Sequence, residues 1–163
     1  MTHIRNAARE RLEEGELSLG IGVRQARSVD IGRIMKTCGY DWLFIDMEHG
    51  SMSVDDTVQI SIAASDAGIA PIVRVPGFQH FHATRVLDGG ALGVVFPHVD
   101  TAKTACELVS FCRYPPHGHR SVVGALPQID FRTLPLSETT QAINDAVLVV
   151  VMLESPEAID RVE

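Results

Sequence analysis

The sequence has no surplus of positive charge, no long hydrophobic run and few cysteines, and each shortage argues against a class of protein. Its 14 Lys and Arg residues against 21 Asp and Glu give a formal net charge of −7. This balance disfavours binding to nucleic acid and favours a small anion held by a few local cations or by a metal. No run approaches the ~20 apolar residues of a membrane span, and the charged helix expected over residues 1–12 lacks the apolar stretch of a signal peptide. We therefore expect a cytoplasmic protein that neither binds nucleic acid nor contacts a membrane.

Cysteine and glycine patterns narrow the choice of cofactor. We expect the three cysteines to be reduced, packed thiols on helices, because they lack metal-type spacing; they are Cys38, Cys106 and Cys112. The glycine pairs at 20/22 and 89/90 have neither the third glycine of a dinucleotide fingerprint nor the Gly-Lys-Ser/Thr of a phosphate-binding loop. A nucleotide cofactor is therefore not supported.

Short apolar runs alternate with amphipathic helical patterns along the chain. Such alternation predicts an α/β protein with a parallel sheet, and the expected strands are Leu17–Val23, Trp42–Asp46, Pro71–Val75, Gly93–Pro97 and Val147–Leu153. Helices are expected from Ser28 to Cys38, from Ser53 to Gly68, around Phe81–Leu87 and over Thr101–Arg113, and a last one begins at Ser155. The connection Tyr114–Arg132 is too long and too rich in proline and glycine to be a simple linker. A barrel of eight such units takes about 250 residues, so the chain holds about five of them and leaves an unpaired edge.

Charged side chains follow the second expected strand. Asp46, Glu48 and His49 come directly after an apolar segment, at the strand end where barrels of this kind carry reactive groups. Asp46 could hydrogen-bond one nitrogen of the His49 ring and make it a general base. Alternatively, Asp46 caps the loop and His49 is an ordinary surface histidine. Three ionisable groups at this point are hard to explain by packing, which favours a functional site.

Two further charged residues interrupt or end apolar strands. Arg74 must reach a carboxylate, a bound anion or solvent, because an unpaired buried guanidinium is costly. It is interpreted as an anion clamp or as the ion-pair partner of Asp46 or Glu48. Glu154 offers a hard oxygen ligand suited to Mg²⁺ or Mn²⁺, although a capping or salt-bridging role is the usual one. The remaining histidines after the expected strands or in the long connection are interpreted as polar loop residues; they are His80, His82, His98, His117 and His119.

Four segments together resemble the HpcH/HpaI family of metal-dependent aldolases. They are Gly39–His49, Pro71–Val75, Val99–Ala102 with Arg113–Gly118, and Leu153–Ser155, and the resemblance runs from about Leu17 to the end of the sequence. It implies that residues 1–163 form part of a TIM (β/α)₈ barrel domain. It also implies a carbon-carbon lyase that cleaves or forms 2-oxo-3-deoxy acids through a pyruvate enolate.

The resemblance implies a role for each of these residues. His49, oriented by Asp46, would be the base and act through a metal-bound water. Arg74 would bind the substrate at the developing enolate oxygen, and Glu154 would bind a divalent metal, Mg²⁺ or Mn²⁺ with Co²⁺ as a further option. Glu48 would support these residues without touching the substrate. The partners implied are pyruvate, an aldehyde and further copies of the chain in a homo-oligomer.

Other features fit or qualify this resemblance. The only lysines, Lys36 and Lys103, are expected on helices rather than at strand ends, which argues against an imine-forming aldolase. The family's second metal-binding carboxylate would lie beyond Glu163, and Met152 stands where many relatives carry a polar residue. Two alternatives stay open: a catalytically incomplete fragment or interaction module of this fold, and a lyase that acts on coenzyme A thioesters.

Overall fold

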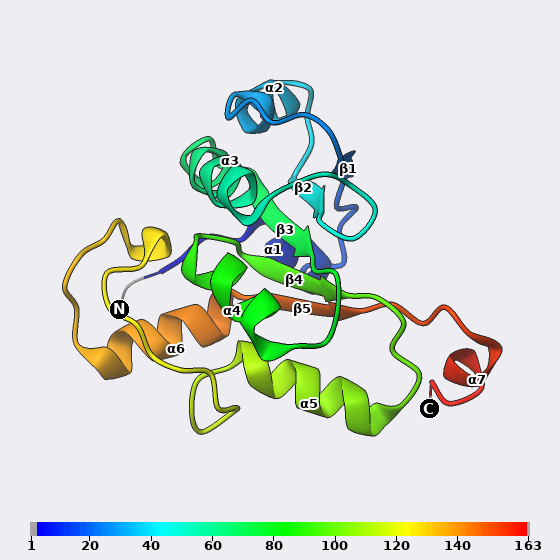
Figure 1. Cartoon of the computed structure of the whole chain (residues 1–163). Coiled ribbons are helices and arrows are strands. Elements are labelled where there is room, and N and C mark those ends of the chain that lie inside the picture. The colour runs from blue at the N-terminus through cyan, green and yellow to red at the C-terminus, as the bar shows by residue number, and fades with distance from the viewer. Residues whose placement is uncertain (1–2, 163) are drawn as a thin grey trace.

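The fold is a single parallel sheet with its strands side by side in chain order. The computed structural model describes residues 3–162, and its five strands pair in the order β1-β2-β3-β4-β5 (Figure 1). They are β1 Gly20–Val23, β2 Trp42–Asp46, β3 Ala70–Arg74, β4 Gly93–Phe96 and β5 Leu148–Val151. Every neighbouring pair is parallel, as in successive β/α units of a TIM barrel. The predicted α/β class and parallel sheet are confirmed.

Helices separate successive strands. They are α1 Ala7–Glu13, α2 Ile31–Thr37, α3 Val54–Asp66, α4 His80–Asp88, α5 Ala102–Cys112, α6 Leu136–Ala146 and α7 Pro156–Ile159, with a short 3₁₀ turn, η1, at Pro127–Ile129. Ser53 caps α3 as predicted, in a reciprocal pair of hydrogen bonds with Asp56. The helix stop at Gly68 is also confirmed, because this glycine adopts a left-handed φ of +74°.

Three local predictions need correction. The helix expected from Ser28 begins at Ile31, and its first turn follows Asp30 instead. The charged N-terminal helix starts only at Ala7, while Met1 and Thr2 lie outside the described residues. Cys38 and Cys106 are exposed, so only Cys112 is a packed thiol.

Helix α6 was not predicted. It follows the long connection and buries Ile143 and Ala142 against the core. Asn144 fixes the start of that connection, since its side chain accepts a hydrogen bond from the Tyr114 backbone N–H at 2.8 Å and donates one to the Tyr114 carbonyl at 3.1 Å. The helix therefore anchors a segment that the sequence alone presents as a loop.

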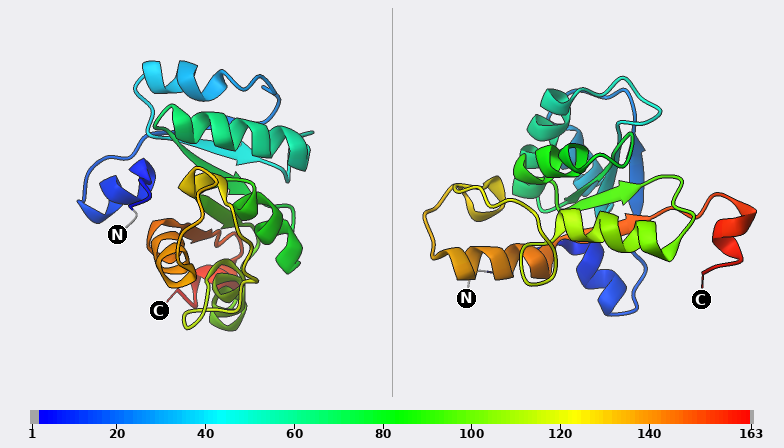
Figure 2. Two further views of the ribbon diagram at one scale, coloured as in Figure 1. Left: turned by 90° about the vertical axis from the view of Figure 1, so that its left-hand side faces the viewer. Right: turned by 60° about the horizontal axis from the view of Figure 1, so that its bottom comes forward.

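The two ends of the sheet differ. Helix α1 lies apart from the helices that follow β1 (Figure 2), near the end where β4 and β5 begin. The buried Asn6 side chain donates to the carbonyls of Leu92 and Ala146 there, at 2.9 and 2.8 Å. The opposite end, where the strands finish, is left to polar side chains.

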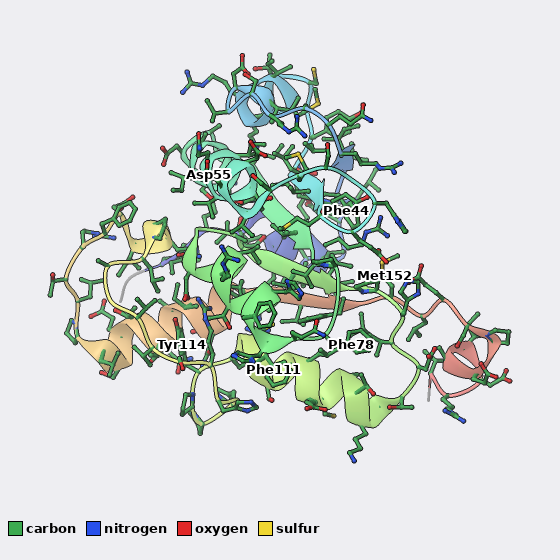
Figure 3. All side chains as sticks on the ribbon, in the orientation of Figure 1. Phe44, Asp55, Phe78, Phe111, Tyr114 and Met152 are labelled. Carbon is green, nitrogen blue, oxygen red and sulfur yellow. The ribbon has the colours of Figure 1, made fainter. Side chains whose placement is uncertain are left out.

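One face of the sheet forms an open apolar groove. Its volume is about 280 Å³, and side chains from β2 to β5 line it together with residues near α1; they include Trp42, Phe44, Ile72, Val95, Val150 and Met152. Figure 3 shows Phe44 and Met152 near one another at the end where the strands finish. The alternate residues Leu43 and Ile45 are fully buried in the core. In a closed TIM barrel, the side chains on the face opposite the helices point inward and fill the barrel in layers.

Candidate active site at the strand ends

The centre of the site is a buried ion pair between the last residues of β2 and β3. The parallel register pairs Asp46 directly with Arg74, so both side chains project from the same face of the sheet. Arg74 Nε donates to Asp46 Oδ1 at 3.0 Å and Nη2 donates to Oδ2 at 2.7 Å. The side chains are only 11% and 2% exposed. This two-point contact fixes the plane of the guanidinium.

The ion pair shifts the pKa of both groups. Burial alone would raise the pKa of Asp46, but the hydrogen bond from Arg74, those from the backbone and the nearby positive charge together hold it below its ordinary value of 3.8. The hydrogen bond to Asp46 raises the pKa of Arg74 against the opposing effect of burial. The two groups therefore stay charged at neutral pH.

The predicted contact between Asp46 and the His49 ring is replaced by contacts with the backbone. Asp46 Oδ1 accepts hydrogen bonds from the backbone N–H groups of Glu48 and His49, both at 3.1 Å. The His49 side chain is 59% exposed, and its Nε2 lies 3.8 Å from Glu48 Oε2. Asp46 thus shapes the loop that carries His49 through these backbone hydrogen bonds. Both Asp46 oxygens also bind Arg74. The interpretation of Asp46 as a cap of the loop is the one the geometry supports.

Glu48 connects the strand ends to one another. Its Oε2 lies 3.1 Å from Arg74 Nη1, and its Oε1 lies 3.0 Å from His98 Nε2. The prediction that Arg74 forms an ion pair with Asp46 or Glu48 is confirmed for both. Arg74 also lies 5.3 Å above the Phe44 ring, so its guanidinium borders the apolar groove.

His98, interpreted from the sequence as a polar loop residue, contacts the carboxylates of two strand ends. It lies two residues after β4, and its backbone N–H donates to Glu154 Oε2 at 2.9 Å while ring Nδ1 lies 3.2 Å from the same oxygen. Its place after an apolar strand was the available signal, shared with Asp46 and Glu154. Contacts therefore run without a break from Arg74 through Glu48 and His98 to Glu154.

The carboxylates at these strand ends could bind a divalent cation, although the described residues supply only part of a metal site. Within residues 3–162, no three His, Cys, Asp or Glu side chains are grouped so that they could hold a metal ion. Glu154 uses only Oε2 in the contacts above, which leaves Oε1 as a hard oxygen ligand. Glu154 therefore fits as one ligand of a cation that also needs other oxygen donors.

Comparisons with known proteins show which family this chain resembles. The family model described as HpcH/HpaI aldolase/citrate lyase matches residues 25–163. A 4-hydroxy-4-methyl-2-oxoglutarate aldolase of Hapsidospora irregularis is 36% identical over the whole chain and 61% of its own length. A 2-keto-3-deoxy-L-rhamnonate aldolase of Escherichia coli is 34% identical over 97% of this chain and 58% of its own length.

A solved structure has a similar fold. The HpcH/HpaI aldolase of Desulfitobacterium hafniense superimposes with a TM-score of 0.88 at 30% identity, over 93% of this chain and 58% of that one. The chain thus spans 58–61% of the length of these three proteins. No helix in the described part of the chain is long and apolar enough to cross a membrane. On the match of sequence and fold, the chain belongs to the HpcH/HpaI aldolase/citrate lyase family.

Proposed function

We propose that the protein is a carbon-carbon lyase that cleaves or forms 2-oxo-3-deoxy acids through a pyruvate enolate. The observation that carries the proposal is that Arg74, Glu48, His98 and Glu154 contact one another at the end of the sheet where the strands finish. His49 lies on the same loop as Glu48 and exposes its ring there. The aldolase names of the relatives support the reaction class.

Arg74 is proposed to bind the substrate where negative charge develops. A guanidinium has five N–H donors, and Asp46 takes two of them while Glu48 lies beside a third nitrogen. Of the two remaining N–H groups, one on Nη1 faces the Met152 sulfur at 4.0 Å, and the one on Nη2 is left to meet the oxygen at C2 of the 2-oxo acid, which becomes the enolate oxygen. Because Asp46 fixes the guanidinium plane, this donor is positioned before the substrate arrives.

His49 is proposed to move the proton. In the cleavage direction it takes the proton of the C4 hydroxyl, the C3–C4 bond breaks, and C4 leaves as an aldehyde carbonyl. The electron pair of that bond forms the enolate of pyruvate, and the protonated His49 returns the proton to C3. Glu154 would hold a divalent cation, Mg²⁺ or Mn²⁺, which supplies Lewis-acid stabilisation of negative charge on the substrate when bound.

Exchange of the pyruvate methyl protons with deuterium tests the proposal. The protein at its natural full length, supplied with Mg²⁺ or Mn²⁺, should exchange these protons in D₂O, as followed by proton NMR. Removing the base in His49→Gln should slow the exchange by at least about 100-fold. The matched substitution His117→Gln, at an exposed histidine of the long connection, should leave the rate unchanged.

Arg74→Lys separates charge from geometry. Lysine keeps the positive charge but loses the two-point contact with Asp46, so exchange should fall strongly, whereas Arg33→Lys on the exposed side of α2 should have no effect. If the metal-supplied protein exchanges no protons, the pyruvate-enolate proposal is wrong.

Self-association is proposed for the long connection. Residues 114–132 expose Val122, Val123 and Phe131, and exposed apolar side chains of this kind are typical of contact surfaces. Light scattering after size-exclusion chromatography should give a mass that is a multiple of the chain. A monomer at micromolar concentration would contradict the homo-oligomer.

A further inference from the structure

His98 has an unusual backbone for a residue with a side chain. Its φ is +55°, in the left-handed region that non-glycine residues seldom adopt. Directly after it, the Val99 N–H donates to the Met152 carbonyl at 3.0 Å, so the chain beyond β4 stays beside the chain beyond β5. The left-handed turn therefore directs the His98 N–H at the Glu154 carboxylate across this pairing.

The ring of His98 joins two carboxylates from different strand ends. Its Nδ1 lies 3.2 Å from Glu154 Oε2 and its Nε2 lies 3.0 Å from Glu48 Oε1. Both ring nitrogens face carboxylate oxygens, so neither offers a lone pair to a metal ion in this arrangement. Glu48 is in turn held by Arg74, which ties the imidazole to the central ion pair.

Among the described residues, the hydrogen bonds and ion pairs of Glu154 come from His98 alone. Both contacts fall on Oε2, one from the backbone and one from the ring. The Glu154 side chain is 34% exposed and lies three residues beyond Val151, the last residue of β5, outside the strand pairing of the sheet. Without His98, no other hydrogen bond or ion pair among the described residues would hold this carboxylate.

We propose that His98 is a positioning residue that holds Glu154 with Oε1 directed at the divalent cation. This inference rests on the proposed function, since it assumes that Glu154 is a metal ligand. A carboxylate held through one oxygen loses less rotational freedom when the other oxygen binds a metal. Groups that orient metal ligands in this way typically contribute 10–100-fold to metal affinity.

Mn²⁺ affinity measures this role independently of turnover. We would titrate the full-length protein with Mn²⁺ and follow the free ion by electron paramagnetic resonance. Glycine and asparagine both tolerate the left-handed backbone. The variants His98→Gly and His98→Asn therefore keep the backbone N–H at this position but lack the imidazole. Each should raise the Mn²⁺ dissociation constant by at least about tenfold, and His117→Asn should leave it unchanged.

A second measurement separates positioning from a purely structural role. The melting temperature of each variant is recorded without metal, and then the shift produced by Mn²⁺ is recorded. The positioning role predicts a smaller Mn²⁺ shift in the His98 variants. A variant that melts earlier without metal but binds Mn²⁺ as tightly as the parent would overturn the positioning role. Hyperfine coupling between Mn²⁺ and a nitrogen nucleus that is lost when the His98 ring is removed would also overturn it, because His98 would then be a direct ligand. If the parent protein binds no Mn²⁺, the metal-dependent function itself fails. Equal affinity in parent and variants rejects only the role of His98.

Discussion

Replacing Arg74 by methionine should destabilise the protein because it leaves the Asp46 carboxylate buried without its main partner. The side chain of Asp46 is 2% exposed, and after the change it keeps two backbone hydrogen bonds and a distant contact with Arg24 Nε at 3.5 Å. Breaking a buried ion pair by removing one partner costs about 3–5 kcal/mol. Since these contacts compensate in part, we expect the free energy of unfolding to fall by about 3 kcal/mol at pH 7.

The pH dependence identifies the cause. In the parent protein the folded pKa of Asp46 is lowered, so its contribution to stability is fully present above the unfolded pKa of about 3.9 and is lost as the pH falls through the folded value. In Arg74→Met, burial is no longer offset by the guanidinium, so the pKa of Asp46 should rise above the unfolded value. Protonation of Asp46 then removes the unpaired buried charge of the variant. The difference in unfolding free energy between the parent and Arg74→Met should therefore narrow as the pH falls from 7 towards 4.

Urea unfolding followed by the fluorescence of Trp42, the only tryptophan, measures this difference at pH 7 and pH 4.5. Arg33→Met removes an exposed arginine of α2 and should change the unfolding free energy by no more than about 0.5 kcal/mol. A loss below about 1 kcal/mol at pH 7 for Arg74→Met, or a difference that stays constant with pH, would refute this account of the ion pair.

Two substitutions and one labelling experiment test how the helices are capped and packed. Gly32→Ala should lower the unfolding free energy by about 1–2 kcal/mol, although alanine has the better helix propensity, because the new Cβ would lie 2.8 Å from the Ala64 Cα. Gly124→Ala, with open space around the new Cβ, is the control in the same urea experiment. Ser53→Ala should cost about 1 kcal/mol by removing the cap of α3, and a helix content by circular dichroism and a stability equal to those of the parent would contradict it. Burial raises the pKa of the Cys112 thiol to about 12. A thiol reagent at pH 8 should therefore label the other two cysteines of the folded protein at once and Cys112 only on unfolding. Rapid labelling of all three cysteines would disprove the burial of Cys112.

The secondary structure was most predictable where local signals and tertiary packing agree. The apolar run of β2 and the serine cap of α3 are both strong local signals, and both elements form as expected. Helix α6 follows Pro135 and has no side-chain cap, so little in its own sequence announces it. It is stabilised mainly by burying Ile143 and by the hydrogen bonds of Asn144 to Tyr114, a residue 30 positions away.

The candidate site was predictable as a set of strand ends, but of its contacts only the ion pairs of Arg74 with Asp46 and Glu48 were predicted. Asp46, Arg74 and Glu154 each interrupt or end an apolar run, and a parallel sheet brings such ends to one edge. The role of His98 could not be read in the same way, because it depends on a left-handed backbone and on a neighbour 56 residues away. No spacing rule connects residues at that separation.

The sequence by itself determined the alternation of strands and helices and the placing of charge at the strand ends, since both follow from the local periodicity of apolar side chains. Only the tertiary structure decided which charges meet. Asp46 pairs with Arg74 rather than with the nearby His49 ring, because strand register sets the two side chains beside each other on one face of the sheet. Register depends on how whole strands align, and that alignment is a property of the assembled sheet rather than of any one segment.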